Sequence, residues 1–438
     1  MLLGCRTVYS VCLEYPMAAG AGAKIGMAVA AGAAAAGAYF IISGGISLAL
    51  LHSAPAAFPG QSVAIDGLAY RPTSTVSAQL HRLSLEGSSL SPAEVVTLFS
   101  PGPLVGGARE AFGKLTAEKI LTPEILVTVP GGTLTLRGLE ISHVQAGMAA
   151  QLRIVGGDLT LKANGADVAT FKIGALTLAD IDVGYVFGAL RNGNVKSDFL
   201  RYGTLLWDGM TGTLTVPHPQ GAEQTAIELG EVQVANVYEA GLPKRSAVAF
   251  AGIRFTPGSG LLTSTLASIG LETIDVTGKI AVSYDWPQRK VTVEDVTLAV
   301  AGLATFSLKG SFGNADKAIL VPDQDARNAA NLGMTLESGS LKFTNTGLVD
   351  KLVELGAKLG GRPAEAVKTE ALAAFSRLLL GGKGRLEDGP AMAAFIKDPR
   401  SLTLSIKPKA GVAQVSFDKM NGQLRDIGRF EMEIRSND

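Results

Sequence analysis

The chain has 438 residues, of which 39 are basic and 39 acidic, so its formal net charge is zero. It contains no concentrated block of basic residues, which argues against nucleic acid as a partner because phosphate binding needs a basic face. The length allows two or three domains, or one extended β architecture that takes up most of the chain. Both cysteines, Cys5 and Cys12, precede Met17, so a chain that starts at Met17 has neither a disulfide framework nor a thiol nucleophile.

Residues 25–51 form an uncharged apolar run of 27 residues, which is long enough to cross a bilayer as one helix. Lys24 precedes it, so we expect residues 1–24 to be a cytoplasmic leader and the body to lie outside the cytoplasm. The alternative is a cleaved signal peptide, because Ala54-Pro55-Ala56 has the form of a cleavage site. The run is about twice as long as the apolar core of a signal peptide, ~7–15 residues, which favours an uncleaved anchor. Both alternatives place the body in the same compartment.

Residues 52–127 are expected to form a mixed helical region ahead of the sheet. Ser91-Pro92-Ala93-Glu94 is a capping box with proline at the first helical position, so it predicts a short helix. A second helix is predicted over residues 108–120, ending before Thr122-Pro123.

Residues 128–332 are expected to form an antiparallel β body, because apolar residues recur there at every second position. The phrase G-x-L-T-L or a close variant begins near residues 132, 157 and 212, with looser echoes near 339 and 401. Residues 280–308 predict three strands of a meander, with a turn over residues 285–288. The alternation slips by one residue at Glu294-Asp295, which predicts a β-bulge.

Residues 333–438 are expected to form a terminal α+β unit. After a strand, leucines 348, 352, 355 and 359 share one helical stripe, a second helix is predicted over residues 367–379, and a third over residues 390–397. Alternation then returns at residues 401–407 and 412–417. We expect the leucine stripe to pack against the adjacent sheet, with contact to lipid or a partner as the alternative.

No catalytic pattern emerges from the sequence. The four histidines form no H-x-x-x-H or H-x-H pair, and neither a G-x-S-x-G elbow nor a phosphate-binding loop occurs. The acidic segment at residues 323–325 lacks the glycine that a calcium loop needs at its sixth position. We therefore expect a protein that is not an enzyme and that has no metal or cofactor.

A single apolar run followed by amphipathic strands such as VTVEDVTLAVAGLATFSLKGSF resembles the AsmA-like proteins of Gram-negative envelopes. The resemblance covers roughly residues 125–312 and includes no diagnostic motif. It implies a long, curved antiparallel sheet with an apolar inner face, an inner-membrane anchor, a periplasmic body, and a role in moving phospholipid or in outer-membrane homeostasis. The chain departs from this pattern because it is short for a bridge between two membranes and ends in an α+β unit.

A second resemblance covers residues 338–417. A strand, leucine-rich helices, the sequence F-I-K-D-P and then L-T-L resemble a recurrent uncharacterised bacterial envelope module. This resemblance implies the compartment but no activity.

The predicted fold class is therefore β-rich α+β, with an N-terminal transmembrane helix, an extended curved antiparallel sheet and a C-terminal α+β unit. The leading hypothesis is an anchored envelope protein whose sheet shields lipid acyl chains or an apolar face of an envelope partner. The rival hypothesis is a structural or adaptor protein with a closed β core, because period-two alternation occurs in both. The candidate groove residues are Val296, Leu298, Val300, Phe306 and Leu308.

Overall fold

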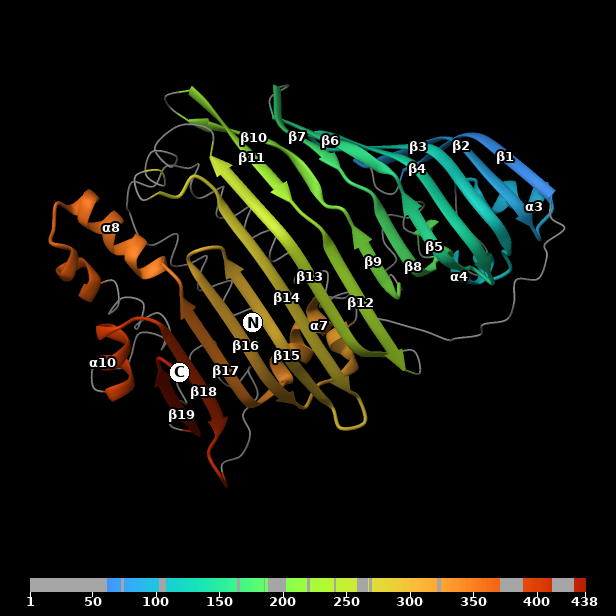
Figure 1. The fold of residues 1–438 in the computed structure, drawn as a ribbon. Coiled ribbons are helices and arrows are strands. Elements are labelled where there is room, and N and C mark those ends of the chain that lie inside the picture. Colours follow the sequence, from blue (N-terminus) through green and yellow to red (C-terminus); the bar gives the residue numbers. More distant parts are fainter. Residues whose placement is uncertain are drawn as a thin grey trace.

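The computed structural model describes a single antiparallel sheet of nineteen strands with helices near its ends (Figure 1). Among the described helices, none is long and apolar enough to span a membrane, and the apolar run at residues 25–51 lies outside the described part. The described residues are 61–438, with gaps at 72–74, 102–107, 164–165, 185, 188–201, 219–220, 240–241, 258–266, 268–269, 321–323, 371–388 and 412–428.

The strands confirm the prediction of a β-rich antiparallel protein. The last three strands continue the same sheet, so the strands of the predicted terminal unit do not form a sheet of their own. In chain order the strands are β1 Gln61–Tyr70, β2 Ser77–Ser88, β3 Ala117–Val129, β4 Gly132–Gln145, β5 Met148–Ile154, β6 Gly156–Ala163, β7 Ala166–Ile173, β8 Leu176–Asp182, β9 Thr204–Trp207, β10 Met210–His218, β11 Gly221–Leu229, β12 Val232–Glu239, β13 Leu242–Pro257, β14 Ile274–Asp285, β15 Lys290–Val300, β16 Ala304–Gly313, β17 Thr335–Asn345, β18 Ser401–Pro408 and β19 Phe430–Ser436.

Between the long strands β4 and β13, the sheet consists of two parallel lanes of short strands. One lane pairs in the order β5, β8, β9 and β12, and the other in the order β6, β7, β10 and β11. The chain alternates between the lanes, since only one or two residues separate β5 from β6, β7 from β8, β9 from β10 and β11 from β12. We call this line of breaks across the sheet the crease; it consists of Val155, Gly174-Ala175, Asp208-Gly209, Gly230-Glu231 and, within β13, Ala251-Gly252.

Glycines make the crease possible because adjacent backbones approach too closely there for a side chain. Gly174 N–H donates to Gly209 O at 2.8 Å, and Gly230 N–H donates to Gly252 O at 3.0 Å. A Cβ atom on Gly230 would lie 2.1 Å from Ala251 O, and Gly209 has a φ of +86° in the left-handed region. The sequence pattern of glycines between strands therefore encodes a line along which the sheet changes direction.

Replacing a crease glycine should cost stability without removing any contact. We expect Gly230→Ala to lower the free energy of unfolding by about 2–3 kcal/mol, because the added methyl group meets a main-chain oxygen that cannot move independently. Gly333→Ala is the matched control, since its Cβ would have no heavy atom within 4 Å. Urea unfolding of the two variants tests the prediction, and an equal effect of both changes would contradict it.

The β1 end of the sheet has a closed core beneath two helices, α3 (Pro92–Phe99) and α4 (Ala108–Phe112). The predicted capping box of α3 is confirmed, with Ser91 and Glu94 each hydrogen-bonded to the main chain of the other. Phe99, Phe112 and Phe187 form a fully buried aromatic group with ring centroids 4.8–5.6 Å apart. This end of the molecule is a conventional closed core.

The prediction of a helix over residues 108–120 is wrong after Phe112. Residues 117–129 form β3, a central strand whose alternation was obscured by Pro123. Pro123 lies between the pairs Thr122–Leu139 and Glu124–Arg137, opposite Gly138, whose φ of +62° marks an irregularity in β4. A proline within a central strand is compatible with pairing at such an interruption, because no ladder hydrogen bond is required of it there.

Toward the other end, helical segments pack against β12–β19. They include η1 (Lys317–Leu320), α7 (Gln324–Gly333), α8 (Leu348–Gly360) and α10 (Pro390–Lys397), and residues 364–370 are helical too. The predicted bounds of α10 and the bulge at Glu294-Asp295 are confirmed. Most of the predicted helix over residues 367–379, and the predicted strand over residues 412–417, lie outside the described residues.

The predicted packing face of α8 is displaced. Val349 and Val353 are buried against Phe343 and Phe395, whereas Leu352 is 48 % exposed. The valines at positions i and i+4 form the contact with the sheet, so the leucine stripe lies partly outside it.

Candidate functional site: an apolar face covered at its ends

The register of the strands aligns apolar side chains into a continuous row across the whole sheet, which we call the central row. Its fifteen members are directly paired from one edge strand to the other, and each is valine, isoleucine or leucine. They are Val63, Leu85, Ile120, Ile141, Leu152, Leu178, Leu205, Val234, Val248, Ile280, Val296, Leu308, Leu341, Leu404 and Ile434. Because paired residues point to the same face, this row defines the apolar face of the sheet.

Burial divides the central row into a closed part and an open part. The six members from Val63 to Leu178 are at most 7 % exposed and belong to the core beneath α3 and α4. From Leu205 to Ile434 the members are partly buried, with the exception of Val248 at 7 %. Leu205 and Val234 pack against the core beneath α3 and α4, and Ile434 packs against the core beneath α8 and α10. With strands spaced ~4.8 Å apart, the nine residues of the open part extend over roughly 38 Å.

Two parallel rows widen the apolar face on the other side of the crease from the central row. Among the described residues, most members of these rows are only partly buried and belong to no closed core. One row contains Leu136, Ile173, Met210, Leu229, Ile253, Val276 and Val300, and the next contains Leu134, Leu159, Phe171, Ile227, Phe255 and Ile274. The apolar face is therefore several side chains wide and follows the long direction of the sheet.

The structure brings the five candidate groove residues together on this face. Val296 pairs with Leu308 and Leu298 pairs with Phe306, while Val300 pairs with Ala304 at the end of the hairpin. All five are partly buried. Phe306 differs from the others because its ring lies 5.1 Å from that of Phe343, at the border of the core beneath α8 and α10.

Sequence reasoning missed the residues that continue the row on either side of this hairpin. Leu205 and Val234 come from the short strands of one lane, and Leu341, Leu404 and Ile434 come from the C-terminal strands. Their alternation was visible, but their alignment with Val296 depends on pairings between strands that are distant in sequence. The G-x-L-T-L phrases were the available signal, since Leu134 and Leu159 of two such phrases are directly paired.

The opposite face of the sheet is polar and carries balanced ion pairs. Lys279 lies 2.6 Å from Asp295, Arg245 lies 2.9 Å from Glu294, and Arg254 contacts both Glu228 and Asp275. Hydrogen bonds from Lys279 and Thr297 hold the pKa of the Asp295 carboxyl below its usual range. Polar side chains outward and apolar side chains inward are the arrangement expected of an antiparallel sheet with one solvated face.

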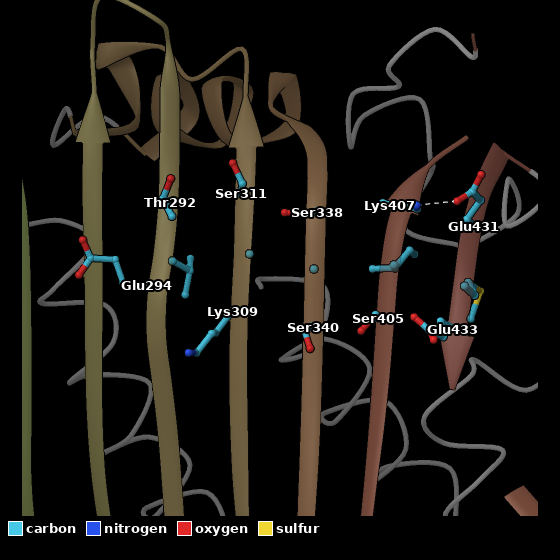
Figure 2. Close-up of a pocket in the computed structure, with 15 residues that line it drawn as sticks. Thr292, Glu294, Lys309, Ser311, Ser338, Ser340, Ser405, Lys407, Glu431 and Glu433 are labelled. Carbon is cyan, nitrogen blue, oxygen red and sulfur yellow. Dashed lines mark ion pairs between the residues drawn. The ribbon is translucent and has the colours of Figure 1, made fainter. Parts of the chain in front are cut away.

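A hollow of about 710 Å³ lies on the polar face over β15–β19 (Figure 2). Strand alternation places the serines 311, 338, 340 and 405 on its floor, and Lys407 forms an ion pair of 2.9 Å with Glu431 at its border. Its lining contains no histidine or cysteine, and the described residues contain no cluster of three or more His, Cys, Asp or Glu side chains placed to hold a metal. The hollow is thus lined by hydroxyl groups, by charged side chains and by the apolar residues Val293, Ile406 and Met432.

Comparison with known families gives one match. A family model described as "Uncharacterized protein" matches residues 297–434, from within β15 to within β19. No curated protein matches the chain. The matched segment includes residues 338–417, on which the resemblance to an uncharacterised envelope module rests, and it contains the last four members of the central row.

The closed and open parts of the central row should respond differently to a buried charge. We expect Ile141→Asp, at a fully buried position, to lower the free energy of unfolding by about 3–5 kcal/mol or to prevent folding. Leu308→Asp, in the open part, should cost about 1–2 kcal/mol because the carboxylate can remain hydrated. Thr305→Asp, on the polar face of the same strand, is the control for adding a charge to β16. Urea unfolding measures all three, and loss of folding in Leu308→Asp would show that the row is covered there too.

Proposed function

We propose that the protein is a membrane-anchored envelope protein that holds lipid acyl chains along the open part of its apolar face, in lipid transport or outer-membrane homeostasis. The observation that carries the proposal is the central row, which stays valine, isoleucine or leucine across all its strands and, apart from Val248, is only partly buried beyond Leu178. An apolar ligand or partner would bury the part of this row that the closed cores leave accessible.

Acyl chains fit the shape and chemistry of this surface. They bind by removing apolar area from water, which contributes about 25 cal/mol per Å² and requires no convergent polar groups. A single leaflet spans about half of the ~30 Å hydrocarbon core, so the open part of roughly 38 Å is longer than one extended acyl chain of a bilayer lipid. The side-by-side rows separated by the crease give the face the width to receive more than one chain.

The membrane anchor and the compartment are the part of the proposal that rests on sequence. Residues 25–51 would form a single inner-membrane span, with Lys24 on the cytoplasmic side and the sheet in the periplasm. The resemblance to AsmA-like proteins supports this arrangement. An anchored sheet would place its apolar face within reach of the membrane from which lipid is taken.

Lipid contact is tested by photo-crosslinking in the full-length chain. A photoreactive residue at Val296 or Leu341, both in the open part of the central row, should capture phospholipid, whereas one at Thr305 or Ser340 on the polar face should not. Leu298→Asp should reduce the captured lipid several-fold, because an acyl chain would have to desolvate the carboxylate. A folded, lipid-free protein with no face-dependent capture would leave the rival function, a structural or adaptor protein with a closed core.

The topology has a separate test. A reporter enzyme that is active only outside the cytoplasm should be active when fused after Asp438 and inactive when fused at Lys24, because the positive residue precedes a single apolar run. A cytoplasmic reporter should give the opposite pattern at both positions. Activity of the first reporter at Lys24 alone would contradict the proposed orientation and compartment.

A further inference from the structure

The last strand, β19, presents an edge of the sheet that can accept another strand. Among the described residues it pairs only with β18, so its outer main-chain groups form no ladder within the described sheet. The apolar face reaches this edge without a break, since Ile434 pairs with Leu404 and Met432 pairs with Ile406. The central row therefore continues to this edge, where Ile434 packs against the core beneath α8 and α10.

The charged side chains of β19 restrict what can pair there. Glu433 and Arg435 form an ion pair of 2.7 Å with each other, their side chains are 57 % and 64 % exposed, and on the inner side they face the neutral residues Ser405 and Thr403. Glu431 already forms an ion pair of 2.9 Å with Lys407. One acid and one base, two residues apart on the polar face, are thus the charges that a strand across the edge would meet.

From this pattern we infer that a second copy of this chain pairs with β19, antiparallel, about a two-fold axis through Ile434. In this register Ile434 lies opposite its own counterpart, so the two central rows join end to end. Glu433 lies opposite Arg435 of the second copy, and the same pair recurs on the other side of the axis. Cross-strand pairs of opposite charge stabilise antiparallel strands.

Other two-fold registers of β19 conflict with its sequence. An axis through Glu433 opposes the two Glu433 side chains, and an axis through Met432 opposes Glu431 to Glu433, so both place like charges directly opposite. An axis between two residues would set apolar side chains against the polar face. Beyond Ser436 the strand ends, because Asn437 has a φ of +61° and accepts a hydrogen bond from Ser401 N–H.

The inferred pairing rests on the sequence and edge of β19 and does not depend on the proposed function. Two joined sheets would present one apolar face with the large closed cores beneath α3 and α4 at the far ends and the smaller cores beneath α8 and α10 beside the joint. The contact is a short edge pairing, so we expect a dimer that dissociates on dilution.

A single cysteine at the axis tests the register in the full-length chain. With Cys5 and Cys12 replaced by serine, Ile434→Cys should form a disulfide-linked dimer under mild oxidation, because residues directly opposite have Cβ atoms about 4.5–5.5 Å apart, close to disulfide geometry. Met432→Cys on the same face is the control, since in this register it lies opposite Ser436 and away from its counterpart. Equal or greater cross-linking at Met432, or none at either position, would overturn the inference.

A second test of the register reverses the charges of Glu433 and Arg435. Glu433→Arg and Arg435→Glu should each weaken dimerisation about tenfold or more in sedimentation experiments over a concentration series, since each creates two like-charged pairs. The double variant E433R/R435E should recover the affinity of the parent chain, because the opposite pairs are restored with their signs exchanged. Urea unfolding verifies that all three variants fold. A double variant as weak as the single ones would contradict the register.

Discussion

The structure depends on one constraint, the cross-strand register that keeps alternate apolar side chains on the same face over nineteen strands. A slip of one residue in any strand would move its whole apolar set to the polar face. The bulge at Glu294 shows how the phase is retained, since Val293 and Val296 are three residues apart yet pair with Gly310 and Leu308 of one face. The crease likewise keeps the apolar side chains of both lanes on one face. Leu205 and Met210 lie on either side of Asp208-Gly209, and both belong to the apolar face.

Helices cover only parts of that face, and this separates stability from binding. Beneath α3 and α4, apolar side chains and three packed aromatic rings form a closed core, and Val349, Val353 and Phe395 close a smaller core against Phe343 near the other end. A third core, around Val291, Ile319 and Leu320, covers part of β12–β15. Outside these cores, the apolar rows remain partly accessible while the opposite face is solvated by threonines, serines and ion pairs. The proposed role in lipid handling uses the uncovered region, and the inferred pairing at β19 would place a second copy beside the core beneath α8 and α10.

The features that the sequence predicts correctly depend on residues that are close together in the chain. Alternation at residues 280–308, the bulge, the capping box of α3 and the bounds of α10 each depend on neighbours in the chain, so they could be found without a structure. The pairing of Leu298 with Phe306 follows from the same short hairpin. The lanes could not be predicted, because β5 pairs with β8 and β9 with β12 through long-range contacts. For α8, the leucine stripe suggested one face, whereas the sheet is contacted by Val349 and Val353; the choice between adjacent stripes depends on the position of the partner.

The most direct test of the account is the water accessibility of the central row in the lipid-free, full-length protein. Spin labels at Ile141, Ile280 and Leu404 would be compared by the deuterium signal that D₂O contributes to each label. The account predicts a dry label at Ile141 and wet labels at Ile280 and Leu404 that become dry when phospholipid is added. Labels that are dry at all three positions without lipid would show that the row is covered throughout, and would contradict an open apolar face.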